Sequence, residues 1–245
     1  MAERLAVVTG GTRGLGRAVT LELAGAGYDV VAVYHADDRA AEELRLAAAA
    51  RPGGVRVECL RCDLAREPLA LPARGPFEGF VLVHAAAASF DVKPLHLVTA
   101  DELAEQWAVA VRGLHACALP LLRLLPRTRR GTIVAISSTA AVEPGGPPRG
   151  FGAYASAKAA MQALVKSLAR EYGDRGLRTL SVAPGFMATS LTDRWPAALR
   201  EAVAARGSCT PLEAARFVRA LIEDETLPAA GEEYLVRSPA VDPTP

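Results

Sequence analysis

Hydrophobic and polar positions follow two patterns along the chain, short apolar runs typical of buried strands and longer amphipathic segments typical of helices. The first apolar run, residues 5–8, leads into a glycine-rich turn at 9–16 and then an amphipathic segment that begins at Arg17. A second run at 29–34 is followed by a helical pattern at 38–50. This order of strand, glycine turn, helix and strand predicts a parallel α/β unit.

The same alternation continues to the end of the chain. Further strands are expected at residues 55–60, 79–83, 132–136, 177–182 and 233–236, and further helices at 99–125, 151–173, 188–206 and 211–225. A proline-broken connection covers 66–76, and 239–245 is expected to be an irregular tail. Because neither a composition break nor a repeat interrupts the pattern, we predict a single α/β domain over residues 1–238. Its expected core is a Rossmann-like, doubly wound parallel sheet of about seven strands.

The composition excludes several classes of partner. Hydrophobic residues make up 51 % and charged residues 22 % of the chain, which is usual for a globular protein. A net charge of +1 and an aromatic content of 5 % give no support for binding nucleic acid or an anionic membrane surface. No apolar run reaches the roughly 18 residues of a membrane helix, and the first residues lack a signal-peptide pattern. We therefore expect a cytoplasmic protein.

The cysteines and histidines do not form a metal-binding pattern. Cys59 and Cys62 have CxxC spacing, but no second pair completes a zinc site. His84, His96 and His115 have no metal-ligand spacing with one another. We interpret the cysteines as buried structural thiols and expect no metal site.

The glycine-rich turn at 9–16 has the sequence TGGTRGLG and lies between a predicted strand and a predicted helix. Glycines let the backbone turn sharply and approach a pyrophosphate, whose charge the helix N-terminus stabilises. Such turns can also be simple tight connections, but the flanking elements here are those of a dinucleotide site. The predicted phosphate-binding residues are Gly10, Thr12, Arg13, Gly14, Leu15 and Gly16.

The end of the second predicted strand indicates which dinucleotide binds. An acidic residue at this place marks NAD, whereas basic groups accommodate the 2′-phosphate of NADP. The strand ends with Tyr34 and His35, and Asp37 and Asp38 are better interpreted as caps of the next helix. Because Arg13 can offer a guanidinium to a phosphate, NADPH is favoured over NADH.

The helix that begins near residue 151 carries the candidate chemistry. Tyr154 and Lys158 lie four residues apart and therefore share one helix face, where the cation is expected to lower the pKa of the phenol. Taken alone, this spacing also fits an ordinary helix start. Ser138 follows the strand at 132–136, and ligands in parallel sheets bind beyond the strand C-termini. We therefore expect Ser138 and Tyr154 to converge beside a nicotinamide.

With these residues identified, the chain resembles the short-chain dehydrogenase/reductase family along nearly its whole length. TGGTRGLG resembles the family's TGxxxGxG loop, and Ser138, Tyr154 and Lys158 match its catalytic triad. The layout and the YASAK segment most resemble 3-oxoacyl-carrier-protein reductases and polyketide ketoreductases. The resemblance implies further cofactor contacts at Tyr34, His35, Asp63, Leu64, His84, Ala85, Ala86, Tyr154, Lys158, Pro184, Gly185, Met187 and Thr189.

The implied activity is NADPH-dependent reduction of a ketone to a secondary alcohol by hydride transfer, with a β-ketoacyl thioester or polyketide-type substrate. The alternatives are a reductase of a free small alcohol, sugar or ring ketone, and a cofactor-binding protein with little catalysis. A substrate presented on an acidic acyl carrier protein favours a basic patch, for which Arg127, Arg129 and Arg130 are candidates. The resemblance also implies a homotetramer or a homodimer.

Two departures from the family pattern bear on the candidate chemistry. The family's NNAG motif reads His84-Ala-Ala-Ala87 here. The fourth catalytic residue of the family is an Asn that holds a water between the lysine and solvent. Its place is expected near Gly113 or Leu114, and the chain contains no Asn. We therefore expect proton resupply by another route, past His84 or His115.

Overall fold

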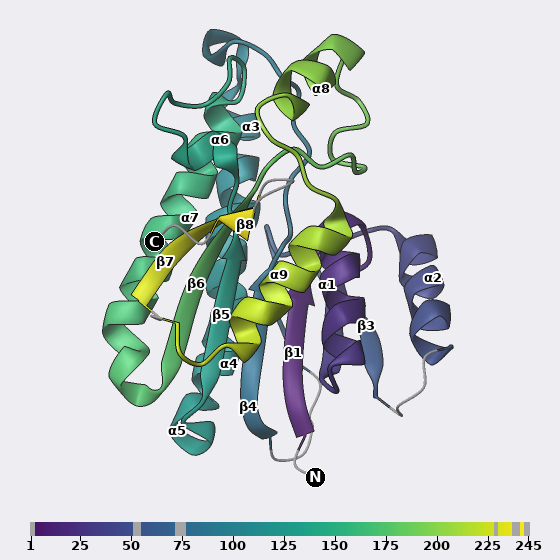
Figure 1. The fold of residues 1–245 in the computed structure, drawn as a ribbon, viewed down its shortest axis with the longest axis vertical. Coiled ribbons are helices and arrows are strands. Elements are labelled where there is room, and N and C mark those ends of the chain that lie inside the picture. The colour runs from purple at the N-terminus through teal and green to yellow at the C-terminus, as the bar shows by residue number, and fades with distance from the viewer. Residues whose placement is uncertain (1–2, 51–54, 72–76, 228–229, 237–240, 243–245) are drawn as a thin grey trace.

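The molecule is built on one twisted sheet with the strand order β3-β2-β1-β4-β5-β6-β7-β8 (Figure 1). It was obtained as a computed structural model, which describes residues 3–50, 55–71, 77–227, 230–236 and 241–242. All strand pairs from β3 to β7 are parallel, and only β8 runs antiparallel to its neighbour β7. The seven parallel strands confirm the predicted fold class.

The elements alternate along the chain as the apolar pattern predicts. The strands are β1 Glu3–Thr9, β2 Asp29–Tyr34, β3 Val57–Arg61, β4 Phe77–His84, β5 Gly131–Ile136, β6 Leu177–Pro184, β7 Ala230–Val236 and β8 Val241–Asp242. The helices are α1 Gly14–Gly25, α2 Asp38–Ala49, α3 Ala100–Trp107, α4 Gly113–Leu122, α5 Leu125–Thr128, α6 Thr139–Val142, α7 Gly152–Tyr172, α8 Ala197–Ala204 and α9 Pro211–Glu223. Short 3-10 turns lie at Leu95–Leu97 and Gly173–Arg175, and a π-helical turn lies at Ala108–Arg112.

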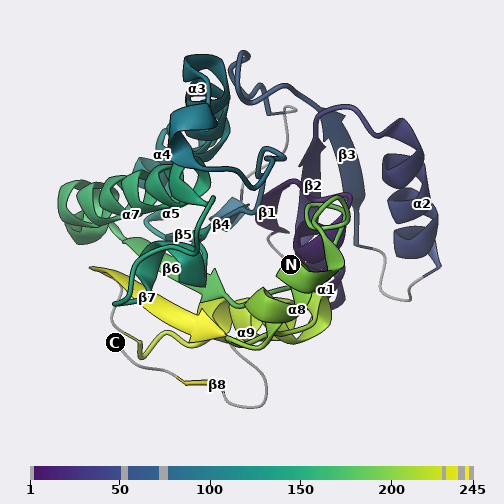
Figure 2. The same ribbon diagram turned by 90° about the horizontal axis from the view of Figure 1, so that it is seen from above.

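Helices cover both faces of the sheet (Figure 2). On one face, α4 and α7 pack Leu114, Leu121 and Met161 against the strands. On the other face, α1 and α9 contribute a second core with Leu23 and Val218. Because both faces are covered, the central strands are apolar on both sides, which is why they read as continuous runs rather than alternating ones.

Two predicted helices differ from the structure. The segment expected at 99–125 begins at the predicted capping box of Thr99 and Glu102, but the π-helical turn interrupts it. The helix expected at 188–206 is confined to α8, Ala197–Ala204. Pro196 has no N–H to donate and disfavours helical geometry at the residue before it, so the helix cannot begin earlier. The preceding turn is instead held by Thr192, whose hydroxyl donates to the Met187 carbonyl at 3.1 Å.

The tail was expected to be irregular, but Val241–Asp242 forms the short strand β8 against Leu235 and Val236. The other tail residues, 239–240 and 243–245, lie outside the described part of the chain, as do residues 72–76 of the proline-broken connection. Within the described residues, no helix has both the length and the apolar character needed to cross a membrane.

Candidate active site

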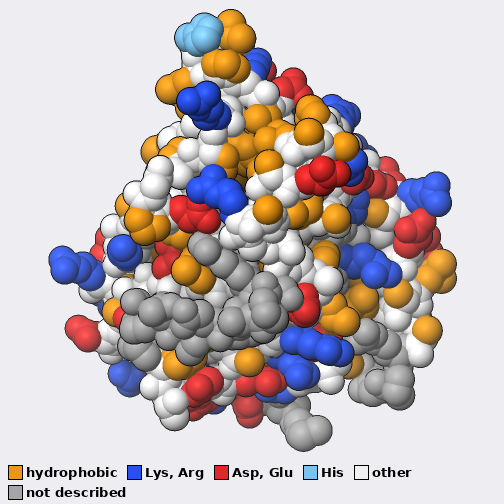
Figure 3. Space-filling model, turned by 45° about the horizontal axis from the view of Figure 1, so that its top comes forward, with side chains coloured by type: hydrophobic (Ala, Val, Ile, Leu, Met, Phe, Trp, Pro, Cys, Tyr) orange, Lys and Arg blue, Asp and Glu red, His pale blue; other side chains and the backbone are white. Residues whose placement is uncertain are grey.

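A cavity of about 1070 Å³ lies beyond the C-terminal ends of the parallel strands. Hydrophobic side chains gather on the upper part of the face shown in Figure 3, which is the end of the molecule where these strands end. Almost every predicted site residue lines this cavity: Gly10, Thr12, Arg13, Gly14, Leu15, Gly16, Tyr34, His35, Asp63, Leu64, Ala85, Ala86, Ser138, Tyr154, Lys158, Pro184, Gly185, Met187 and Thr189. The sheet therefore brings segments far apart in the sequence to one site, as expected from strand ends that share an edge.

The glycine loop has the geometry of a phosphate cradle. Gly10 and Gly14 adopt φ angles of 64° and 50°, which favour glycine. A Cβ atom on Gly16 would lie 2.2 Å from the Gly10 carbonyl oxygen, so only glycine fits there. Helix α1 begins at this loop without a side-chain cap and without an acidic residue in its first turn, which leaves its N-terminal N–H groups available to an anion. The pyrophosphate of a dinucleotide fits this arrangement.

The adenosine end of the cavity contains an ion pair that the sequence does not reveal. The Asp37 carboxylate caps α2 by accepting from the Ala40 N–H at 2.9 Å, as predicted, and its other oxygen lies 3.2 Å from the Arg13 guanidinium. Asp37 lines the cavity as well. Arg13 therefore points to the end of β2, where a 2′-phosphate would compete with Asp37 for the guanidinium.

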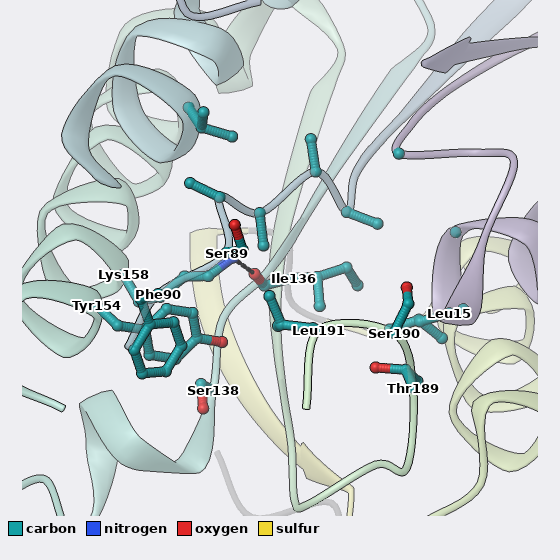
Figure 4. Close-up of a pocket in the computed structure, with 18 of the residues that line it drawn as sticks. Leu15, Ser89, Phe90, Ile136, Ser138, Tyr154, Lys158, Thr189, Ser190 and Leu191 are labelled. Carbon is teal, nitrogen blue, oxygen red and sulfur yellow. Dashed lines mark hydrogen bonds between the residues drawn. The ribbon is translucent and has the colours of Figure 1, made fainter. Parts of the chain in front are cut away.

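The three predicted catalytic side chains converge on one wall of the cavity (Figure 4). Ser138 caps α6, and its hydroxyl oxygen accepts from the Ala140 N–H at 3.2 Å, which leaves its own O–H free to donate. Tyr154 and Lys158 lie in the first two turns of α7. Lys158 is only 3 % exposed, and its ammonium donates to the Ile136 carbonyl at 2.7 Å.

Burial governs the ionisation of the pair. Burial raises the pKa of Tyr154, and a hydrogen bond from Ser138 lowers it by less. Burial also lowers the pKa of Lys158 to about 8. The predicted net lowering of the Tyr154 pKa is therefore wrong for this arrangement, in which burial outweighs any effect of Lys158. The reason is that the ammonium faces the Ile136 carbonyl and lies 5.8 Å from the centroid of the phenol ring.

Aromatic rings surround the candidate catalytic tyrosine, and the sequence interpretation missed Phe90. Phe90 stacks on the Tyr154 ring with centroids 4.7 Å apart and planes at 15°, as Figure 4 shows. Phe151 and Trp195 contact Phe90 edge-on at 5.3 and 5.5 Å, and Phe186 lies 6.3 Å from Trp195. Phe90 follows β4 and Phe186 follows β6, so the strand-end rule that indicated Ser138 could also have indicated these two rings.

His84 does not line the cavity, which corrects its predicted cofactor role. The ring is completely buried, and its Nδ1 and Nε2 lie 3.0 Å from the Thr9 hydroxyl and 3.1 Å from the Val109 carbonyl. Because a carbonyl only accepts, Nε2 carries the proton and Nδ1 accepts from Thr9. Burial lowers the pKa of His84 to about 3, so the neutral ring joins β1 to the π-helical turn.

The two positions where the missing asparagine was expected do not border the cavity. Leu114 is fully buried in the core, and a Cβ atom on Gly113 would lie 3.3 Å from the His84 ring. Among the described residues, those of this helical segment that line the cavity include Ala108 and Val109 but neither Gly113 nor Leu114. His115 is exposed and is not among the cavity-lining residues. Neither histidine is thus placed to carry a proton from the cavity.

The predicted basic patch lies at the wrong end of the molecule. Arg127, Arg129 and Arg130 lie in and after α5, directly before β5 begins, and α5 is at the bottom of Figure 1. The cavity is beyond the opposite ends of the strands. Arg130 also forms an ion pair with Glu225. These arginines therefore do not border the candidate active site.

Comparison with known proteins agrees with this geometry. Residues 4–200 match a family model described as short chain dehydrogenase. The chain is 28 % identical over 200 residues to a 3-oxoacyl-[acyl-carrier-protein] reductase of Synechocystis, covering 79 % of this chain and 78 % of the relative. It is 33 % identical over 196 residues to a 2,5-dichloro-2,5-cyclohexadiene-1,4-diol dehydrogenase of Sphingobium indicum, covering 77 % and 74 %. The crystal structure of acetoin dehydrogenase from Enterobacter cloacae superposes with a TM-score of 0.78 at 26 % identity, covering 96 % of this chain and 94 % of that one.

Proposed function

The chain belongs to the short-chain dehydrogenase family, and on that premise we propose that this oxidoreductase is an NADPH-dependent ketoreductase. The observation that carries the proposal is that one cavity contains both a candidate cofactor-binding loop and the candidate catalytic side chains. The glycine cradle at the start of α1 forms one part of its wall, and Ser138, Tyr154 and Lys158 form another. A dinucleotide bound along the strand ends would present its nicotinamide to these side chains.

The proposed mechanism assigns one role to each side chain. The chemistry supplied by bound NADPH is a hydride for the carbonyl carbon. Ser138 and Tyr154 donate hydrogen bonds to the ketone oxygen, and each such donor is typically worth about 2.7–4 kcal/mol as negative charge develops. Tyr154 then gives its proton to that oxygen. Its raised pKa suits this role because burial keeps the phenol protonated before the reaction. Lys158 stabilises the phenolate that results.

The preference for NADPH rests on Arg13. Its guanidinium reaches the end of β2, where the adenosine ribose would lie, and its present partner is an exposed carboxylate, Asp37. A dianionic 2′-phosphate offers the guanidinium more charge and a bidentate contact. Tyr34 and His35 line the same end and add no carboxylate there.

The aromatic lining supports a free ring ketone as the substrate. Flat apolar rings pack well against Phe90, Phe151 and Trp195, and edge-to-face or stacked pairs contribute about 0.5–1.5 kcal/mol each beyond their buried area. The related Sphingobium protein is named for a ring diol. A β-ketoacyl thioester is the second candidate, supported by the similarity to the Synechocystis reductase. The misplaced arginines remove one reason for expecting a carrier protein.

The exposed face of the α3–α4 region supports self-association, and we propose a homodimer or homotetramer through it. Leu103, Trp107 and Leu119 expose 41, 47 and 42 % of their surface, although such side chains are usually buried. Light scattering coupled to size exclusion would test this proposal. A monomer at micromolar concentration would contradict it.

A substrate panel tests the proposed function. Oxidation of NADPH would be followed with a cyclic ketone, an acyclic diketone and a β-ketoacyl thioester at equal concentration. We expect the highest kcat/KM for the cyclic ketone, and a higher value for the thioester would favour the second candidate. Tight NADPH binding without turnover of any ketone would contradict the proposal and favour a cofactor-binding protein without catalysis.

A further inference from the structure

Each ketone reduction proposed above removes a proton from the Tyr154–Lys158 pair, and that proton must be replaced before the next reduction. The inference made here rests on that proposed function. Lys158 donates to the Ile136 carbonyl at 2.7 Å, and a carbonyl cannot supply a proton. The next residue, Ser137, is 2 % exposed and lines the cavity, and its hydroxyl begins a polar cluster that the mechanism does not use.

This cluster connects Ser137 to a carboxylic acid on β7. Gln162 lies one helical turn after Lys158 on α7 and uses both hydrogens of its amide nitrogen. One is donated to the Ser137 hydroxyl oxygen at 2.7 Å and the other to the Glu233 carboxylate. Ser181 donates to the other Glu233 oxygen at 3.2 Å. The Ser137 oxygen accepts from Gln162, so its own O–H remains available to donate, and a hydrogen bond from Ser137 lowers the pKa of the Glu233 carboxyl.

Strand register explains why these groups meet beneath α7. Ser181 of β6 pairs with Glu233 of β7, and Ala135 of β5 pairs with Ser181. Residues paired in parallel strands point to the same face, and Ser137 points to that face as well because it lies two residues after Ala135. The arrangement is therefore fixed by the backbone of three strands and one helix.

Glu233 lies between solvent and the cavity. Its side chain is only partly buried, so it can exchange protons with water. Burial raises the pKa of its carboxyl, and the hydrogen bonds from Ser137, Gln162 and Ser181 and the charge of Lys166 oppose that rise. A cluster that only stabilised the fold would need hydrogen-bond donors and acceptors but no group that can exchange a proton. This cluster has such a group, the Glu233 carboxyl, at its outer end, and the rotatable Ser137 hydroxyl at the cavity wall.

We propose that Glu233, acting through the Ser137 hydroxyl, returns a solvent proton to the active site after each reduction. The Lys158 ammonium first gives its proton to the Tyr154 phenolate and becomes a neutral amine. With the Ser137 hydroxyl turned toward Lys158, the protonated Glu233 carboxyl gives its proton to the Ser137 oxygen, and the proton that this oxygen already carried moves to the Lys158 amine, which becomes an ammonium again. The Glu233 carboxylate then takes a proton from water, so one solvent proton enters per turnover.

Single-turnover and steady-state rates of the NADPH-loaded enzyme with a ketone separate this role from a structural one. We compare Glu233→Gln, which keeps the size of the side chain, with Glu232→Gln, the neighbouring carboxylate outside the cluster. At pH 8 in weak buffer, the first turnover of Glu233→Gln should match the wild type within about twofold, because Tyr154 already holds its proton. Its steady-state rate should fall about tenfold or more, within the range of proton-transfer effects.

Rescue provides the decisive readout. Added imidazole, a small proton carrier, should restore the steady-state rate of Glu233→Gln and leave Glu232→Gln unchanged. Ser137→Ala, which removes only a hydroxyl, should behave like Glu233→Gln, and it keeps the test available if that variant folds poorly. Loss of the first turnover in both variants without imidazole rescue would contradict the relay.

Failure of the relay and failure of the proposed function give different results. A normal wild-type first turnover together with a steady-state rate of Glu233→Gln equal to the wild type contradicts the relay alone. Absence of a first turnover in the wild type with every ketone contradicts the proposed function and the relay together.

Discussion

Substituting Gly16 by alanine should damage cofactor binding far more than it damages the fold. The new Cβ atom would lie 2.2 Å from the Gly10 carbonyl oxygen and 2.7 Å from the Gly10 carbonyl carbon. Because a carbon normally stays about 3.3 Å or more from such an oxygen, the loop and the start of α1 must separate by about 1 Å. Both neighbours are backbone atoms, so no side chain can rotate away to make room.

The magnitudes indicate which effect dominates. Overpacking of this kind typically costs about 1–3 kcal/mol, and the better helix propensity of alanine offsets about 0.5–1 kcal/mol of that cost. For a chain of this size, each kcal/mol lowers the melting temperature by about 2–4 °C. A displacement of about 1 Å in a positioning loop can cost about 100-fold in function. We therefore expect a Kd for NADPH raised about 100-fold with a melting temperature only a few degrees lower.

Gly145→Ala is the matched control, because a Cβ atom there meets nothing within 4 Å. Fluorescence titration with NADPH and thermal unfolding would be measured on both variants. Gly145→Ala should leave both quantities unchanged. Wild-type affinity in Gly16→Ala would refute the assignment of this loop as the phosphate cradle.

Two further substitutions test the cofactor preference and the ionisation of the site. Arg13→Ala should weaken NADPH binding by tenfold or more and NADH binding much less, since only NADPH has a phosphate for the guanidinium, and equal losses for both in titrations would refute that role. Lys158→Met should raise the free energy of unfolding at pH 7, because the wild type holds a buried ammonium whose pKa is lowered to about 8. Between about pH 8 and 10.5 the unfolded chain binds more protons than the native one, so the free energy of unfolding of the wild type rises with pH. In denaturant titrations across this window, the wild type should therefore approach the stability of the variant.

The fold follows from the sequence because each element has a local signal. The apolar run at 29–34 coincides with β2, and the cap at Asp37 and the capping box at Thr99 are present as predicted. Prediction of helices from the local sequence pattern failed where a distant contact or a neighbouring proline determines the structure. The segment at 188–196 has helical composition, but Pro196 and the hydrogen bonds of Thr192 hold it as a turn.

The candidate site was predictable in position but not in ionisation. The strand-end rule located Ser138, and it also places Arg127–Arg130 at the far edge of the sheet because they precede a strand. The raised pKa of Tyr154 depends on burial that no spacing reveals. The contact of Gln162 with Glu233 spans 71 residues and joins helix α7 to strand β7, so no local pattern can indicate it.

The most direct test of the central claim is the Tyr154→Phe variant, measured for NADPH binding and for ketone reduction in the same preparation. The account predicts unchanged NADPH affinity within about twofold, since the ring and its stacking on Phe90 remain. It predicts turnover reduced about 100-fold or more, the usual scale for loss of a general acid. Reduction near the wild-type rate with NADPH bound normally would contradict the assignment of Tyr154 as the proton donor.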